Sequence, residues 1–155
     1  MIEEFVFENK LCAIIIRSHF SHEGIKFFTP NEYSQQLAYM KRPRGYVIAP
    51  HIHNPVKRVV NYTKEVLFVR SGQLRVDFYR ESQEYIESRI LETGDVIFLA
   101  FGGHGFEILS DAEIIEVKQG PYAGENDKTR FAPVENRMVK IGSSAIHCTR
   151  QHPSL

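Results

Sequence analysis

The sequence contains few cysteines, no tryptophan and no surplus of either charge. Cys12 and Cys148 are too few and too far apart in the chain for a disulfide framework or a thiolate zinc site. Nineteen Lys and Arg balance nineteen Asp and Glu, so the formal net charge is zero. Nucleic acids and anionic membranes select proteins with excess positive charge, and we therefore expect neither as a partner.

Long hydrophobic runs are also absent. No run is longer than the six residues of Leu11–Ile16, whereas a membrane-spanning helix needs about 20. The chain opens with Glu3 and Glu4 close to its start, where a secretory signal carries Lys or Arg. These features predict a cytoplasmic protein.

The length of 155 residues is typical of one domain. Neither an internal repeat nor a linker divides the chain. The hydrophobic pattern weakens beyond Phe131, and no periodicity is visible after Ser143. We therefore predict a single domain over residues 1–134 and a poorly ordered tail over residues 135–155.

Short runs rich in Val, Ile, Phe and Tyr alternate with turn signals, which is typical of a β-sandwich or barrel. Residues 73–79 are apolar at every second position, as expected of a half-buried strand. Residues 96–101 are apolar throughout, which indicates a strand between two layers. Two further strands are expected within residues 11–28. The only helix signal is Thr29–Pro30, a hydroxyl cap followed by proline, and that helix would span a turn or two.

Two histidines mark the first candidate site. His51 and His53 are two residues apart on a strand expected over 45–53, so both imidazoles point to the same face. This spacing suits a shared metal ion. The alternative is a polar strand end that precedes the turn at Asn54–Pro55.

A carboxylate and a third histidine follow. Glu65 begins an apolar strand on the same face as Leu67, and a buried carboxylate needs a cation, a hydrogen-bond donor or water. The alternative is that Glu65 lies just outside the core and is solvated. His104 stands between Gly103 and Gly105; by itself it is more typical of a core histidine than of a ligand.

Together these residues resemble the two sequence motifs of the cupin superfamily. The matching order is Gly45-x5-His51-x-His53, Glu65-x6-Gly72, and Gly94 with Gly102 and His104, within residues 40–110. The resemblance implies an all-β jelly-roll barrel, a double-stranded β-helix, with a metal ion at its mouth. Carried over by motif position, the ligands are His51, His53, Glu65 and His104. An insertion over 56–61 lengthens the loop before Glu65.

Three histidines and a glutamate suit Mn, Fe, Ni, Co or Zn, among which the sequence does not choose. Residues 102–106 and 116–122, together with Asp127-Lys128, also resemble small single-domain cupins encoded among polysaccharide and nucleotide-sugar biosynthesis genes. In that setting Glu116, Lys118 and Tyr122 are candidates for the substrate pocket; the alternative is a polar strand end.

The resemblance implies a small-molecule ligand and leaves three functions open. The first is an isomerase or epimerase that acts on a sugar or nucleotide-sugar. The second is an iron-dependent dioxygenase, and the third is a sugar-binding module without catalysis. A purely structural role would leave the convergent His and Glu residues without a purpose.

Residues 13–16 are apolar on both faces of their expected strand, so something must cover the outer face. A second subunit would do this and make the protein a homodimer. The alternative cover is intramolecular, from Phe20, Phe27 and Phe28.

Overall fold

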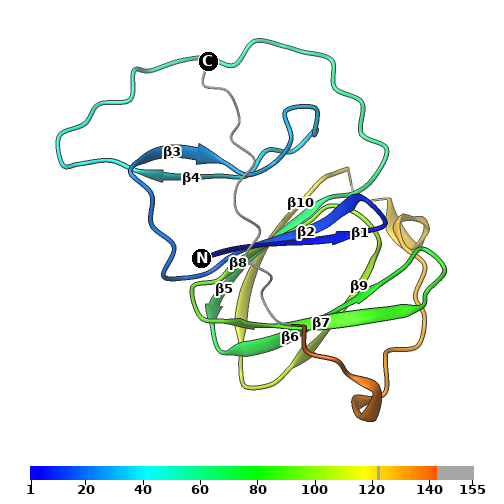
Figure 1. Cartoon of the computed structure of the whole chain (residues 1–155). Coiled ribbons are helices and arrows are strands. Elements are labelled where there is room, and N and C mark those ends of the chain that lie inside the picture. Colours follow the sequence, from blue (N-terminus) through cyan, green and yellow to red (C-terminus); the bar gives the residue numbers. More distant parts are fainter. Residues whose placement is uncertain (122, 143–155) are drawn as a thin grey trace.

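The computed structural model describes residues 1–121 and 123–142, and within them the fold is all-β and antiparallel, with no α-helix (Figure 1). This confirms the predicted all-β class. The elements are β1 (Ile2–Phe7), β2 (Lys10–Ile16), β3 (Gly24–Phe27), β4 (Ala38–Lys41), β5 (Glu65–Ser71), β6 (Gln73–Tyr79), β7 (Tyr85–Glu92), β8 (Val96–Leu99), β9 (Gly103–Ile108), β10 (Glu113–Lys118) and the 3₁₀ turns η1 (Gly124–Asp127) and η2 (Asn136–Met138).

The strands form three sheets, and these do not close into a barrel within the described residues. A five-stranded sheet has the order β1-β2-β8-β5-β10, and a three-stranded sheet has the order β7-β6-β9. Strands β3 and β4 form a separate hairpin. No helix in the part of the chain that is described is long and apolar enough to cross a membrane.

The hydrophobic core lies between the two larger sheets. Val69 of β5 and Ile97 of β8 face Leu74 and Val76 of β6, and all four are fully buried. Full burial of such a side chain stabilises the fold by about 1.5–3 kcal/mol. The core therefore holds the two sheets together and sets the positions of the residues at the ends of their strands.

Strand β2 is apolar on both faces and is covered on both by its own chain. Its residues from Ala13 to Ile16 are at most 7% exposed. Ile14 and Ile16 belong to a second apolar cluster with Phe28, against which Phe20 packs. Phe27, by contrast, points outward and is 51% exposed. The outer face of β2 is thus covered without a second subunit. The homodimer itself stays a prediction.

The two strands expected within residues 11–28 are present as β2 and β3. The helix expected at Thr29–Pro30 is absent, and turns take its place. The Thr29 hydroxyl accepts a 3.0 Å hydrogen bond from the backbone N–H of Leu37 and lies 3.0 Å from Gln36 Oε1. The side chain therefore closes a loop between β3 and β4 instead of capping a helix.

The strand expected over residues 45–53 is also absent. Residues 42–63 contain no strand, and every one of them is exposed. An extended segment forms a stable strand only where a neighbouring strand supplies hydrogen bonds. In the described chain nothing pairs with this segment.

The first part of the expected tail contacts β7. Ile141 forms a parallel β-bridge with Ser88, and the Lys140 N–H donates a 2.8 Å hydrogen bond to the Tyr85 hydroxyl. The rest of the tail, 143–155, lies outside the described residues, as does Cys148. The division of the chain into a domain and a disordered tail therefore stays a prediction.

Candidate functional site

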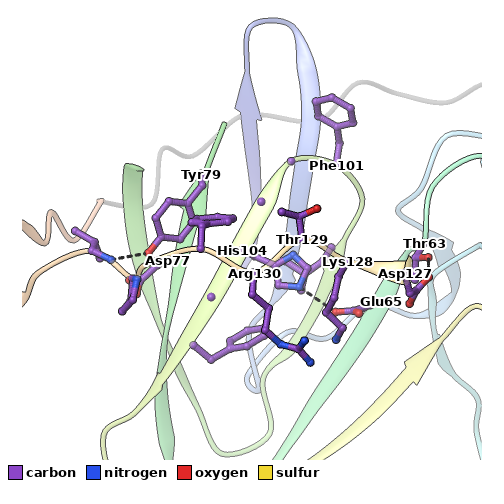
Figure 2. Close-up of a pocket in the computed structure, with 18 of the residues that line it drawn as sticks. Thr63, Glu65, Asp77, Tyr79, Phe101, His104, Asp127, Lys128, Thr129 and Arg130 are labelled. Atoms are coloured by element: carbon purple, nitrogen blue, oxygen red, sulfur yellow. Dashed lines mark hydrogen bonds and ion pairs between the residues drawn. The ribbon is translucent and has the colours of Figure 1, made fainter. Parts of the chain in front are cut away.

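A pocket of about 1130 Å³ opens where the two sheets meet the segment that follows β10 (Figure 2). Strands β5, β6, β8 and β9 contribute its walls, and residues 123–136 close one side. Its polar lining includes Thr63, Glu65, Asp77, His104, Asp127, Lys128 and Arg130. The pocket is large enough for a sugar-sized ligand.

Glu65 and His104 form a direct pair in this pocket. Glu65 begins β5 of the five-stranded sheet, and His104 lies in β9 of the three-stranded sheet. Glu65 Oε2 and His104 Nε2 are 3.0 Å apart, and the side chains are 14% and 28% exposed. The pair therefore joins the two sheets while both groups remain accessible from the pocket.

The charged form of Glu65 is favoured. The hydrogen bond from His104 is the main reason that the pKa of Glu65 lies below its usual value; burial opposes the shift. The positive charges of Lys118 and Lys128 lower it further. A carboxylate beside an imidazole can orient the ring for proton transfer, and the same two groups are ligands for divalent metals.

His51 and His53 lie elsewhere. Both are exposed, within residues 42–63, and their ring centroids are 5.1 Å apart. His51 Nδ1 lies 3.0 Å from the carbonyl oxygen of Ala49. Within residues 1–121 and 123–142 no group of three or more His, Cys, Asp or Glu side chains could hold a metal.

The predicted ligands thus occur as two separate pairs. Each pair has donor atoms of the right chemistry for a divalent transition metal. Neither pair by itself makes a complete site, so the four-ligand set stays a prediction.

The substrate-pocket candidates lie at the edge of this region. Lys118 stands opposite Glu65 in the β10–β5 ladder, which explains its electrostatic effect on that carboxylate. Glu116 is exposed, and its carboxylate lies 3.9 Å from the Lys118 ammonium. Neither residue is among those that line the pocket. Tyr122 lies outside the described residues.

Polar groups of the segment after β10 also line the pocket, and none of them is among the site residues predicted from the sequence. The hydroxyl of Thr63 donates to Asp127 across 3.3 Å, and Arg130 pairs with Glu125. Lys128 lines the same pocket. These residues lie in irregular backbone, where no periodic pattern marks them. The signals in the sequence were the charge-rich run from Glu125 to Arg130 and the place of Asp127-Lys128 in the cupin resemblance.

A buried charged cluster forms the part of the pocket wall that lies on the face of β6 and β9 pointing away from the core. Arg75 donates to both carboxylate oxygens of Asp77, at 2.6 and 3.0 Å, and to Glu107 and Asn136. The hydrogen bonds to Asp77 raise the pKa of Arg75 above its usual value, against the opposing effect of burial. Because Asn136 belongs to the pocket-closing segment 123–136, its hydrogen bond to Arg75 ties that segment to β6.

Tyr79 makes a second attachment on the same face. Its hydroxyl accepts a 2.9 Å hydrogen bond from the backbone N–H of Val134, and its ring packs edge-on against Phe131. Burial raises the pKa of the Tyr79 hydroxyl. The neutral phenol is therefore favoured, and it can accept this bond without an unpaired charge.

Comparison with known proteins assigns no family: no family model, no curated protein and no solved structure matches the chain. The chain is a small all-β protein of antiparallel sheets, with an acid–imidazole pair in a pocket of about 1130 Å³.

Proposed function

We propose that the protein is a metal-binding cupin that acts on a small molecule, with a sugar or nucleotide-sugar as substrate. The observation that carries the proposal is the contact between Glu65 and His104 inside the pocket. These are two of the four residues that the cupin resemblance names. The two residues are far apart in the sequence and lie in different sheets. A chance match to the motifs would give no reason for their side chains to be in contact.

The arrangement of the sheets supports a jelly-roll topology. From β5 onward the chain places β5 in one sheet, β6 and β7 in the other, and then alternates between the sheets with β8, β9 and β10. Such crossing from sheet to sheet is typical of double-sheet jelly rolls. Closure of this sandwich into a complete barrel is part of the proposal.

The donor set fits a divalent metal in part. Glu65 and His104 would supply one carboxylate and one imidazole, and His51 and His53 would supply the remaining imidazoles once they approach. Mn, Fe, Ni, Co and Zn all accept these ligands. A metal ion held there would polarise a carbonyl oxygen of the substrate.

The reaction we propose is an isomerisation or epimerisation. A proton leaves the carbon next to a sugar carbonyl and returns to the same carbon, or to the carbonyl carbon while the neighbouring hydroxyl proton passes to the carbonyl oxygen. Glu65 and His104 would hold the metal ion that polarises this carbonyl. No external oxidant or reductant is consumed. Thr63 and Asp127 offer hydrogen bonds to sugar hydroxyls, and the edge-on rings of Tyr62 and Phe101 offer an apolar surface.

Metal content tests the first half of the proposal. The purified protein is equilibrated with each of the five metals in turn, desalted and analysed by mass spectrometry. We expect about one ion per chain for at least one metal, and a strong loss in Glu65→Gln and His104→Ala. The control is His22→Ala, which changes an exposed histidine outside the pocket. Metal content near zero in the wild-type protein would refute metal binding.

Deuterium exchange tests the second half. Sugars and nucleotide-sugars with a carbonyl group are incubated with the protein in D2O, and we expect deuterium at the adjacent carbon, with His104→Ala inactive. Ligand binding without exchange would favour the sugar-binding module. Oxygen consumption by the iron-loaded protein would favour the dioxygenase.

A further inference from the structure

Residues 42–60, here called the arm, form a basic and apolar segment that stands apart from the sheets (Figure 1). The arm contains Arg42, Arg44, Lys57 and Arg58 and no acidic residue. Because the whole chain is neutral, the remainder carries an equal excess of negative charge. The arm and the body of the protein are therefore electrostatically complementary.

The arm exposes an unusual amount of apolar surface. Val47, Ile52 and Val59 are 79%, 91% and 70% exposed. The other exposed large apolar side chains of the arm are Tyr46, Ile48, Val56 and Val60. Within the described chain the arm makes no hydrogen bond, ion pair or ring contact outside itself. Contiguous exposed apolar surface of this kind marks an interaction site.

A matching surface exists at β9. This strand pairs only with β6, and the order β7-β6-β9 leaves its other edge open in the described structure. An open edge presents unpaired N–H and C=O groups and is a template for an added strand. Phe106 and Ile108 of β9 are partly exposed, at 39% and 54%.

The pocket beside this edge has a small excess of acidic side chains. Its lining contains Glu65, Asp77, Glu107, Asp127 and Glu135 against Arg75, Lys128 and Arg130. A basic, apolar strand is therefore complementary to the edge in backbone hydrogen bonding, side-chain polarity and charge. The arm has all three properties.

We propose that the arm of one copy adds as a strand to β9 of a second copy and completes the second copy's site. In an extended strand His51 and His53 lie on one face, so both can turn toward the Glu65–His104 pair of the partner. A two-fold symmetric exchange completes both sites at once. This inference rests on the proposed metal site and adds that each site is shared between two chains.

A second copy is the occupant that these observations favour. In the single chain the arm is held away from both larger sheets, with its apolar side chains exposed, while the outer edge of β9 remains unpaired in the described structure. Exchange between copies satisfies both surfaces and brings the basic arm to the acidic edge. Docking of the arm on its own β9 is the competing arrangement, and the experiment below separates the two.

The test is complementation between two inactive variants. One variant, His51→Ala with His53→Ala, has a defective arm and an intact pocket. The other variant, Glu65→Gln with His104→Ala, has an intact arm and a defective pocket. The two are unfolded together, refolded at equal concentration and analysed for bound metal. Random pairing makes half of the dimers mixed, each with one intact site, so we expect about one quarter of the wild-type metal content. Each variant refolded alone is the control and should bind almost none.

Failure of the mixture to bind metal, while the wild-type protein binds it, would overturn the shared site and leave the proposed function standing. If the wild-type protein itself takes up no metal, the proposed function fails. The exchange of the arm is then tested separately, by measuring the oligomeric state with light scattering. A wild-type dimer that Ile52→Asp converts to a monomer, while Val6→Asp does not, supports the exchange; Val6 is 52% exposed and lies outside the arm. A monomeric wild-type protein overturns it.

Discussion

Glu65 and His104 are 39 residues apart in the sequence and belong to different sheets, yet their side chains lie 3.0 Å apart. The contact depends on how the two sheets pack, because the apolar core between them helps to set the distance between β5 and β9. The Glu65–His104 contact is also a polar link between the two sheets, at the pocket. Changes at this pair should therefore affect both the chemistry of the pocket and the stability of the fold.

The first prediction concerns the pH dependence of stability. The His104 hydrogen bond lowers the pKa of Glu65 in the folded protein, whereas the unfolded value is about 4.3. The unfolded state thus binds the proton more tightly, and Glu65 stabilises the fold fully above about pH 4.3. This contribution declines as the pH falls through the lower folded pKa. Chemical denaturation in metal-free buffer at pH 7 and pH 3 measures it.

Glu65→Gln is the comparison for this experiment. We expect the wild-type protein to lose more stability than the variant between pH 7 and pH 3, because the variant has no carboxylate to protonate at this position. Equal losses in the two proteins would show that ionisation of Glu65 does not stabilise the fold.

The second prediction tests the core. Leu74 is fully buried between the sheets, and Leu74→Ala should lower the free energy of unfolding by about 2–5 kcal/mol through lost burial and the cavity left behind. Leu109→Ala is the matched control, since Leu109 is 42% exposed and should cost about 0.5 kcal/mol or less. Urea unfolding followed by circular dichroism compares them.

The third prediction concerns the buried Arg75–Asp77 pair, whose side chains are 8% and 4% exposed. Asp77→Ala removes the bidentate partner of a buried guanidinium and should destabilise the protein by about 3–5 kcal/mol. The control is Glu135→Ala, which breaks the exposed pair with Arg137 and should cost about 1 kcal/mol or less. Similar unfolding midpoints for the two variants would contradict the prediction.

The fourth prediction separates a steric clash from backbone strain at two glycines. Gly72 and Gly45 both have positive φ, +83° and +86°. A Cβ at Gly72 would lie 2.1 Å from the backbone oxygen of Asp111, whereas a Cβ at Gly45 would meet nothing within 4 Å. Gly72→Ala should therefore cost at least about 2 kcal/mol and Gly45→Ala about 1 kcal/mol or less. Thermal unfolding of both variants measures the difference.

Local patterns predicted much of the secondary structure. The alternation over residues 73–79 corresponds to β6, with Leu74, Val76 and Phe78 in the core. The apolar run at 96–101 contains β8, which lies inside the five-stranded sheet. These predictions succeeded because the period of a strand is a property of the local chain.

The strand expected over 45–53 shows the limit of this reasoning. Its sequence has strand-like apolar residues, yet the structure contains no strand there. A strand needs hydrogen-bonding partners, and those depend on which edge is within reach. Local sequence carries no information about that.

The polar face of β6 shows a second limit. Arg75, Asp77 and Tyr79 occupy positions that alternation assigns to the side away from the core, yet they are 7%, 3% and 4% exposed. They are buried because the chain around residues 131–142 returns to cover them, with bonds from Asn136 and Val134. A segment some 60 residues away thus decides their environment.

The sequence by itself determined the all-β class, the positions of the core strands and the identity of four residues with ligand chemistry. Only the tertiary structure decided that Glu65 meets His104 while His51 and His53 remain apart from them. The physical reason is that side-chain chemistry and strand period are local properties. Distances between sheets, and the burial of polar groups, follow instead from how the whole core packs.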